Sequence, residues 1–465
     1  MRIAIIGGGP GGYETAIRAA QLGAEVTLFE KESLGGTCLN VGCIPTKALI
    51  HSANLYHQIT KEAAKNGIIV ENAEIDFAKV QERKAAVVKQ LVSGVGALMK
   101  AYGITVVQGA ARFKDAGTLV AQTVDGEVEV PFDRAIIATG SVPSRVPIPG
   151  AELPGVVDST GALDFDHVPE SLTIIGGGVI GIELAHVYQR LGTKITIVEM
   201  LPDILGNIDE SITAVMKRML KRNRSKLHLE SRVNEITEGE GGLIVKFTDA
   251  KGREQEVPSE KVLLCVGRRP YTDGLGLEEI GVSTERGRIV VDGDFKTNVD
   301  GIYAIGDCIG GIMLAHVASA EGIACVEKIM GEKPHTDFSI VPACVYTSPE
   351  IGCVGMTEKE ARDAGIEIEI GQFQLMGNGK SQIEGETSGL VKIIARKEDG
   401  KVLGVHMIGA SATELVHEGA IAMNMGATAE DIASAIHAHP TVGESIKEAA
   451  HAVFGNAINQ PPAKK

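Results

Sequence analysis

The sequence predicts an α/β chain in which two similar units precede a C-terminal α+β domain. Three observations predict this fold class. A short apolar run, a glycine motif and a helical pattern follow one another near the start of the chain, and the same succession begins again at residue 172. The order strand, glycine-rich turn and helix is typical of Rossmann-like dinucleotide-binding domains. From about residue 339 the pattern changes to alternating strands and a hairpin, which is typical of an antiparallel sheet with helices.

The first unit has its glycines between a strand and a helix. Residues 3–6 are apolar, and Gly7, Gly9 and Gly12 follow with the spacing Gly-x-Gly-x-x-Gly. Glycines at these positions let the backbone approach a pyrophosphate at the helix N-terminus. Glu30 ends the next apolar run, 23 residues after the first glycine, where its carboxylate can accept hydrogen bonds from ribose hydroxyls. We therefore expect this unit to bind a dinucleotide.

The second unit repeats this arrangement. Gly176, Gly178 and Gly181 follow an apolar run that begins at residue 172, and Glu199 again lies 23 residues after the first glycine. Two such units predict two dinucleotides in one chain. Glu199 would accept a hydrogen bond from a free 2′-hydroxyl and repel a 2′-phosphate, and the next three residues, Met-Leu-Pro, supply no arginine for a phosphate. The sequence therefore favours NAD over NADP in the second unit.

Two cysteines, Cys38 and Cys43, follow soon after Glu30. Cys38 and Cys43 bracket four residues, one of which is Gly42, and its missing side chain permits the sharp turn that brings two sulfurs within bonding distance. Pro45 suits the first turn of a helix, so Cys43 would lie near a helix N-terminus, where a thiolate is favoured. Lys47 would share a helix face with Cys43 and add a cation. The spacing indicates a redox dithiol; the alternatives for such a pair are a zinc half-site or two buried thiols.

Composition limits the other classes of function. The 465 residues suffice for about three domains, each with its own core. A formal charge of -15 argues against nucleic acid as a ligand, and no run of about 20 apolar residues is present to span a membrane. The chain starts directly with a strand pattern and no signal peptide, so a cytoplasmic protein is expected. The other cysteines stand singly and are expected to be small buried residues: Cys265, Cys308, Cys325, Cys344 and Cys353.

The remaining segments fit this organisation. Asp76 precedes a helical pattern of about 26 residues that ends before Gly103. The apolar runs 135–140 and 262–267 each end in glycine and are interpreted as the exit strands of the two units. In the C-terminal region, the Asp-Gly pair at 399–400 lies between two apolar runs and predicts a hairpin. Helix caps are expected at three threonines, Thr357, Thr428 and Thr441.

Five motifs occur along the chain. In order they are the first glycine unit, Gly-Gly-Thr-Cys-Leu-Asn-Val-Gly-Cys-Ile-Pro-Thr-Lys at 35–47, the second glycine unit, Tyr-Ala-Ile-Gly-Asp at 303–307 and His-Pro-Thr-Val-Gly-Glu at 439–444. Together they resemble the pyridine nucleotide disulfide oxidoreductase family, and most closely those members that oxidise dihydrolipoamide with NAD. The resemblance covers essentially the whole chain. It implies FAD on the first unit, NAD on the second, a homodimer, and a lipoyl-bearing partner protein from a 2-oxoacid dehydrogenase or glycine cleavage complex.

The resemblance also implies how the chain divides. It gives an FAD-binding domain at 1–145, an NAD-binding domain at 146–270, a central segment at 271–338 that returns to the FAD domain, and an interface domain at 339–465. No metal site is expected in any of these segments.

Roles for single residues follow from the same resemblance. It implies that Cys38 exchanges with substrate, that Cys43 contacts the flavin, and that Lys47 and Glu183 form a pair near the reactive edge of the flavin. The residues expected to hold or line FAD are Glu30, Ala111, Thr139, Gly140, Asp307 and Ala315. Those expected to line NAD are Glu199, Val233 and Gly267.

The implied reaction needs a base. Dihydrolipoamide would give two electrons to the cysteine disulfide by thiol–disulfide exchange, which requires a thiolate, and the flavin would pass them to NAD. His439 would be the base, with Glu444 orienting its imidazole. Thr441 and Glu444 also form a capping-box pattern, so the start of the following helix is an alternative role for Glu444. His437 has no comparable acid partner in the sequence. Because His439 belongs to the implied interface domain, we expect it to act on the cysteines of the partner subunit.

Overall fold

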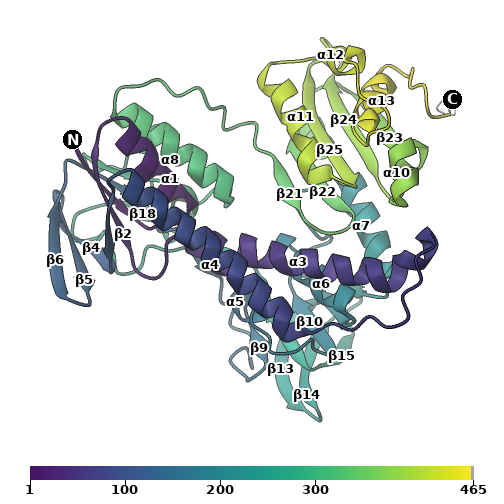
Figure 1. The fold of residues 1–465 in the computed structure, drawn as a ribbon, viewed down its shortest axis with the longest axis horizontal. Coiled ribbons are helices and arrows are strands. Elements are labelled where there is room, and N and C mark those ends of the chain that lie inside the picture. The colour runs from purple at the N-terminus through teal and green to yellow at the C-terminus, as the bar shows by residue number, and fades with distance from the viewer. Residues whose placement is uncertain (462–465) are drawn as a thin grey trace.

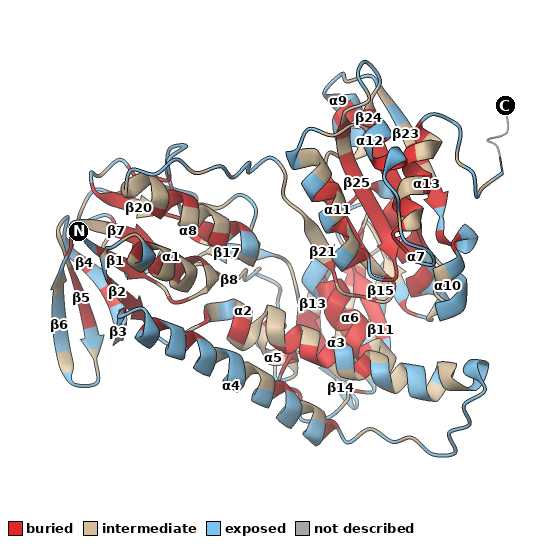
Figure 2. Cartoon of the chain, turned by 45° about the horizontal axis from the view of Figure 1, so that its top comes forward, coloured by how far each residue is buried: buried red, intermediate tan, exposed pale blue. Residues whose placement is uncertain are grey.

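The computed structural model describes residues 1–461, which form three packed regions (Figure 1). The first two regions each contain a five-stranded parallel sheet, and the C-terminal region contains a five-stranded antiparallel sheet. Figure 2 shows that the buried residues concentrate in these sheets and in the helix faces that cover them. The predicted fold class, two Rossmann-like units followed by an α+β domain, is confirmed.

The first region is built around β1 (Arg2–Ile6). Its sheet has the order β20-β7-β1-β2-β3. The strand β20 (Ile302–Ala304) pairs with β7, so the chain comes back to the first sheet after the second unit is complete. Helix α8 (Ala315–Ile329) follows and packs on α1 (Pro10–Gln21); a side chain at Gly322 would meet Thr15 Oγ1 at 1.7 Å, so only glycine allows this approach. The other strands are β2 (Glu25–Glu30), β3 (Thr105–Gln108) and β7 (Arg134–Ile137).

The second region repeats this layout. Its sheet has the order β12-β11-β10-β16-β9, and the pairing of β10 with β11 has the same 23-residue offset as the pairing of β1 with β2. Each region also has a three-stranded antiparallel sheet beside the parallel one. The parallel strands are β9 (Val156–Val157), β10 (Ser171–Ile175), β11 (Lys194–Val198), β12 (Lys226–His228) and β16 (Lys261–Leu264). The antiparallel strands are β4 (Ala110–Asp115), β5 (Thr118–Thr123) and β6 (Gly126–Pro131), and β13 (Arg232–Gly239), β14 (Gly242–Thr248) and β15 (Glu254–Ser259).

Two elements join these regions. The short antiparallel pair β8 (Ser141–Pro143) and β17 (Arg268–Pro270) connects them, and the long helix α4 (Phe77–Ala101) extends from one to the other (Figure 1). The predicted cap of α4 is confirmed, because the Asp76 side chain accepts a hydrogen bond from Lys79 N at 3.2 Å. Lys84 of α4 is buried and donates to Leu163 O at 2.6 Å. The helices of the second region are α5 (Ser159–Ala162), α6 (Val179–Leu191) and α7 (Glu210–Arg222).

The C-terminal sheet has the order β21-β22-β25-β24-β23. The predicted hairpin is confirmed: β24 (Leu390–Arg396) pairs with β25 (Val402–Gly409), and Asp399 accepts from Lys401 N in the turn. The other strands are β21 (Ala343–Val345), β22 (Glu350–Gly355) and β23 (Ile368–Gln374). The helices are α9 (Glu358–Asp363), α10 (Gly379–Glu384), α11 (Ala412–Asn424), α12 (Ala429–Ser434) and α13 (Glu444–Val453).

Two of the three predicted threonine caps are confirmed. Thr357 and Thr428 each form a complete capping box at the start of α9 and α12. The prediction for Thr441 is wrong: α13 begins at Glu444 with Gly443 as its N-cap, and the Thr441 hydroxyl instead donates to Ala438 O at 2.8 Å. The hydroxyl turns back to the preceding segment, so it does not reach the first turn of α13.

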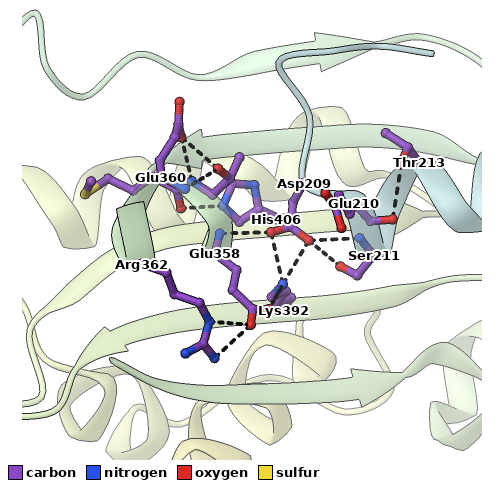
Figure 3. Close-up of polar contacts among 11 residues, drawn as sticks. Asp209, Glu210, Ser211, Thr213, Glu358, Glu360, Arg362, Lys392 and His406 are labelled. Atoms are coloured by element: carbon purple, nitrogen blue, oxygen red, sulfur yellow. Dashed lines mark hydrogen bonds and ion pairs between the residues drawn. The ribbon is translucent and has the colours of Figure 1, made fainter. Parts of the chain in front are cut away.

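A buried ion pair fastens the C-terminal sheet to the second region (Figure 3). Lys392 of β24 lies 2.9 and 3.0 Å from the two carboxylate oxygens of Asp209, the N-cap of α7, and both side chains are only 2% exposed. Lys392 also lies 2.8 Å from Glu358 Oε2, and Glu358 N donates to Asp209. Because buried charges need partners and hydrogen bonds, this cluster fixes how the two regions meet.

In the part of the chain that the structure describes, no helix is both long and apolar enough to cross a membrane.

Candidate active site

The two cysteines lie at adjoining helix ends. Cys38 lies in α2 (Gly36–Val41) and Cys43 is the first residue of α3 (Cys43–His57), with Gly42 between the helices. A side chain at Gly42 would meet Thr37 O at 2.8 Å, which explains the glycine. Both cysteines are free thiols here, and the thiol of one hydrogen-bonds the sulfur of the other. The turn therefore brings the sulfurs together, as a reversible disulfide requires.

The pair is chemically unequal. The hydrogen bond from Cys38, the nearby Lys47 ammonium and the free N–H at the start of α3 together lower the pKa of Cys43 to about 7, against the effect of burial. The same hydrogen bond, together with burial, raises the pKa of Cys38. In the reduced pair the negative charge therefore resides on Cys43.

The predicted partners Lys47 and Glu183 are brought together from different regions. Lys47 Nζ, one turn along α3 from Cys43, lies 2.8 Å from Glu183 Oε2 on α6. Glu183 is almost fully buried, and its other oxygen accepts the backbone N–H of Tyr346 at 3.0 Å. Both oxygens of this carboxylate are thus satisfied, as a buried charge requires.

The first glycine turn has the shape of a pyrophosphate cradle. Helix α1 begins at Pro10 after the N-cap Gly9, and no side chain caps it. A side chain at Gly9 would meet nothing closer than 3.8 Å, so Gly9 faces open space, whereas one at Gly12 would meet Gly7 O at 1.8 Å. Glu30 is buried and accepts from Gly8 N at 2.7 Å. The uncapped helix start beside open space fits an anionic dinucleotide.

The other residues expected to line FAD come from four segments. Asp307, in the short helix η3 (Gly306–Ile309), accepts the Ser141 hydroxyl at 2.5 Å, and Thr139 Oγ1 donates to Tyr271 O at 2.6 Å. A side chain at Gly140 would meet nothing within 4 Å. Ala315 is the first residue of α8, whose start has no side-chain cap, and Ala111 is buried in β4.

The second glycine turn matches the first in detail. Helix α6 begins after the uncapped N-cap Gly178, where a side chain would meet nothing within 4 Å, while one at Gly181 would meet Gly176 O at 2.4 Å. Glu199 accepts from Gly177 N at 2.6 Å, the equivalent of the Glu30 contact. The lone pairs that remain on this carboxylate are available to ribose hydroxyls.

A hollow lies at the junction of β8 and β17. Ser144 N donates to Gly267 O at 3.0 Å, and Ser144 lines a cavity of about 610 Å³ together with Val142, Pro143, Arg145, Asp158 and Arg269. Val233, the other residue expected near NAD, lies in β13 and packs against the same core as Ile175. The residues of the second unit therefore fit a second dinucleotide.

His439 and Glu444 form a pair in the C-terminal region. His439 Nδ1 lies 3.0 Å from Glu444 Oε1, while Glu444 Oε2 accepts Thr441 N at 2.9 Å. Burial opposes ionisation of Glu444, but the hydrogen bonds from Thr441 N and His439 lower its pKa below the ordinary value. One oxygen of this carboxylate therefore holds the imidazole of His439, and the other holds the Thr441 backbone ahead of α13.

The structure does not bring His439 to the cysteines of its own chain. Its side chain is 77% exposed, and among residues 1–461 its hydrogen-bonding partner is Glu444 alone. Figure 2 shows α2 and the region of α12 and α13 in separate parts of the molecule, and Figure 1 agrees for α3 and α13. Within one chain, His439 and the two cysteines therefore lie in separate regions.

Sequence reasoning missed three groups beside these residues. Tyr346 contacts both Lys47 and Glu183. Arg268 donates to the backbone oxygen of Ser141 at 2.6 Å and, at 2.7 Å, to the Ser141 hydroxyl that binds Asp307. His437 has an acid partner after all, because its Nε2 lies 2.9 Å from Glu418 on α11. These pairs are 19 to more than 100 residues apart, so no local spacing could reveal them.

Comparison with known sequences agrees with this geometry. The profile of the pyridine nucleotide-disulphide oxidoreductases matches residues 1–322, and that of the dimerisation domain of the same proteins matches residues 341–450. The chain belongs to this family. Family membership confirms the predicted reaction class and the predicted cofactors, FAD and NAD.

Curated relatives and solved structures cover nearly the whole chain. It is 44% identical to dihydrolipoyl dehydrogenase of Geobacillus stearothermophilus (98% of this chain, 96% of the relative) and 43% identical to the mitochondrial dihydrolipoyl dehydrogenase of Pisum sativum (98% and 92%). It superimposes on LpdA from Mycobacterium tuberculosis with a TM-score of 0.89 at 28% identity (97% of this chain, 99% of that one). The HOCl-induced flavoprotein disulfide reductase RclA from Escherichia coli gives a TM-score of 0.87 at 29% identity (97% and 99%).

Proposed function

We propose that this chain is an NAD-dependent dihydrolipoyl dehydrogenase. It oxidises protein-bound dihydrolipoamide to lipoamide and reduces NAD+ to NADH. The observation that supports this most directly is the hydrogen-bonded thiol pair of Cys38 and Cys43 beside the Lys47–Glu183 ion pair, in a chain that is 41–44% identical to curated relatives, most of them named for this activity.

In this proposal the chemistry begins at the Cys38–Cys43 disulfide. A thiolate of the substrate attacks Cys38 Sγ, the sulfur–sulfur bond breaks, and Cys43 leaves as a thiolate. The second substrate thiol then loses its proton and attacks the first substrate sulfur, which is bonded to Cys38 Sγ in the mixed disulfide. The Cys38 thiolate is released, and the substrate disulfide forms. The substrate loses two electrons and the cysteine pair gains them. The low pKa of Cys43 makes it the better leaving group.

His439 acts as the base for the two substrate thiols in turn: it takes the first proton, releases it to solvent, and then takes the second. The Glu444 carboxylate holds Nδ1, which leaves Nε2 to take the proton, and stabilises the imidazolium that forms. Because His439 is exposed and distant from its own cysteines, we assign it to the cysteines of a second copy of the chain. The match to a dimerisation domain supports such a homodimer.

The two glycine units divide the cofactors. We assign FAD to the first, held by Gly7, Gly9, Gly12, Glu30 and Asp307, and NAD to the second, held by Gly176, Gly178, Gly181 and Glu199. The chemistry that bound FAD would supply is that of a two-electron carrier between the reduced cysteines and NAD+. The division into segments 1–145, 146–270, 271–338 and 339–465 belongs to this proposal, and the return of β20 to the first sheet supports the third segment.

The partners and location are also part of the proposal. A lipoyl-bearing protein is the proposed source of dihydrolipoamide, because a dithiol on a protein arm could reach a site shared by two chains. The proposed compartment is the cytoplasm; fractionation of the source cells tests this, since relatives named mitochondrial are also similar to the chain.

Turnover of purified holoenzyme tests the activity. NADH formation from dihydrolipoamide and NAD+ should be rapid, and the Cys38→Ser variant should lose it while keeping its flavin absorbance. Absence of NADH formation by a flavin-loaded wild type, with reduction of another disulfide by NADPH instead, would contradict the assignment.

A further inference from the structure

Tyr346 makes two separate contacts with the ion pair beside the cysteines. It follows β21 in the C-terminal region, and its backbone N–H donates to Glu183 Oε1 at 3.0 Å. Its ring centroid lies 4.6 Å from Lys47 Nζ, within the range of a cation–π interaction. One residue therefore touches both members of the pair, one through its backbone and the other through its side chain.

Lys47 depends on such contacts for its position. Its side chain is 32% exposed, whereas that of Glu183 is 4% exposed and is held on both oxygens. A lysine has a long flexible stem and a point charge, so a single ion pair leaves its ammonium several rotamers. The ring of Tyr346 removes that freedom, because it confines the ammonium to the space between the ring and the carboxylate.

The Tyr346 side chain stays uncharged near neutral pH, so it does not compete with Glu183 as a second anion. Burial raises the pKa of Tyr346 to about 12, so the phenol stays neutral. Its ring then acts on Lys47 only through its electron-rich face.

We propose that Tyr346 is a positioning residue that fixes the Lys47 ammonium beside Cys43, so that the C-terminal region controls the charge on the reactive sulfur. This inference rests on the proposed function, because it takes Lys47 to stabilise the Cys43 thiolate. It goes further in making the ionisation of Cys43 depend on a residue some 300 positions away that touches neither cysteine.

Four groups face Cys43, and a test must separate their effects on its pKa. Cys38 donates its thiol hydrogen from α2, Lys47 lies on the same helix α3, Glu183 faces it from α6, and the half-buried Arg268 acts from β17. Arg268 is held by two hydrogen bonds to Ser141, and Glu183 is held on both oxygens. Lys47, which is half-buried and has one ion pair, should change position most when the ring is lost.

The test is the pH titration of Cys43 in flavin-loaded protein. In a Cys38→Ser background Cys43 has no disulfide partner, and the serine hydroxyl still donates to its sulfur. The thiolate is followed by its long-wavelength charge-transfer absorbance, and separately by the rate of iodoacetamide alkylation of the Cys43 peptide. Tyr346→Leu keeps the backbone N–H to Glu183 and removes only the ring, whereas Tyr346→Phe keeps the ring.

We expect Tyr346→Leu to raise the apparent pKa of Cys43 by about half a unit, the scale of one cation–π contact, and Tyr346→Phe to leave it unchanged. Lys47→Met should raise it by at least as much as Tyr346→Leu. A purely structural role for Tyr346 would lower the urea midpoint of Tyr346→Leu without moving the titration, and that result would overturn the inference. If Tyr346→Leu does not fold, Tyr346→Met, whose longer and more flexible side chain can fill the space of the ring, provides the same comparison.

The two proposals fail differently. If Lys47→Met does not move the titration, the charge beside Cys43 is wrongly assigned, and both the inference and the proposed role of Lys47 fall. If Lys47→Met moves it and neither Tyr346→Leu nor Tyr346→Met does, the inference alone is wrong.

Discussion

The Nδ1 atom of His439 lies 3.0 Å from the Oε1 atom of Glu444, while the other oxygen of the same carboxylate accepts the backbone N–H of Thr441. The backbone contact fixes the carboxylate, and the carboxylate fixes the ring. One acid thus orients an exposed imidazole without burying it, which suits a base that must meet a substrate arriving from outside the chain.

Removal of this base should separate two activities. We expect His439→Gln to lower dihydrolipoamide turnover by about 10² or more, the usual scale for loss of a general base. Reduction of a one-electron acceptor by NADH should survive, because it does not use thiol exchange. Glu444→Gln should cause a smaller loss, since the amide still accepts from Thr441 N but no longer stabilises an imidazolium. Steady-state assays with both acceptors measure this; equal loss of both activities would point to misfolding or to a lost cofactor.

The thiol pair should titrate unequally. With a pKa of about 7, roughly half of Cys43 is thiolate at pH 7, whereas an ordinary thiol of pKa about 9 is about 1% ionised there. Because the hydrogen bond from Cys38 is the largest cause, Cys38→Ala should raise the pKa of Cys43 and move its alkylation to higher pH. Peptide mapping after iodoacetamide treatment at pH 6 to 10 measures this. Cys308 and Cys353, whose pKa values burial raises, serve as internal controls that should stay unreactive.

The second dinucleotide should be NAD. Glu199 is fixed by Gly177 N at 2.6 Å and Leu201 N at 2.7 Å, and a 2′-phosphate beside this carboxylate would be repelled. We expect kcat/KM for NAD+ to exceed that for NADP+ by at least about tenfold, or 1.4 kcal/mol. Glu199→Gln should narrow the ratio by removing the charge. Equal kcat/KM values for NAD+ and NADP+ in the wild type would contradict this prediction.

The buried ion pair between the C-terminal sheet and the second region should contribute strongly to stability near neutral pH. Lys392→Met leaves Asp209 buried without its counter-ion and should cost about 3–5 kcal/mol, measured as a lower urea midpoint. The double variant Lys392→Met/Asp209→Asn should recover part of this loss, because no buried charge remains in the pair.

The stability that this ion pair contributes should decrease as the pH falls. Burial alone would raise the pKa of Asp209, but hydrogen bonds from Ser211 and Lys392 outweigh it, and the pKa is lowered in the folded protein. Its contribution is therefore fully present above the unfolded pKa of about 4 and is lost as the pH falls further. Urea midpoints at pH 3 to 7 should fall with acid more steeply in the wild type than in the double variant, and parallel curves would contradict this account.

Much of the fold could be predicted because its signals are local. The two glycine turns, the acids 23 residues later and the Asp399–Gly400 hairpin each occupy a short stretch whose backbone geometry limits the residues allowed. The same holds for the turn at Gly42. Thr441 shows the limit of this reasoning, because the capping pattern is present but the N-cap of α13 is Gly443 and the Thr441 hydroxyl donates back to Ala438 O.

The contacts between regions could not be predicted. Tyr346, Arg268 and Lys392 meet their partners across 100 or more residues, so only the packing of the regions decides them. Lys47 and Glu183 were paired only by resemblance to a family. Nothing in the sequence around either residue predicts a contact with the other. Such contacts join the three regions, which is why the sequence indicated the proposed reactive residues better than the residues that hold them.

The central claim, that each active site uses the cysteines of one chain and His439 of another, is tested most directly by mixing two inactive variants. Cys38→Ser and His439→Gln chains are combined under conditions that allow subunit exchange, and dihydrolipoamide turnover is followed. A mixed dimer would have one intact site and one doubly defective site, so random exchange should restore about a quarter of wild-type activity. If mass spectrometry shows that mixed dimers form and activity stays at the level of the separate variants, the shared site is wrong.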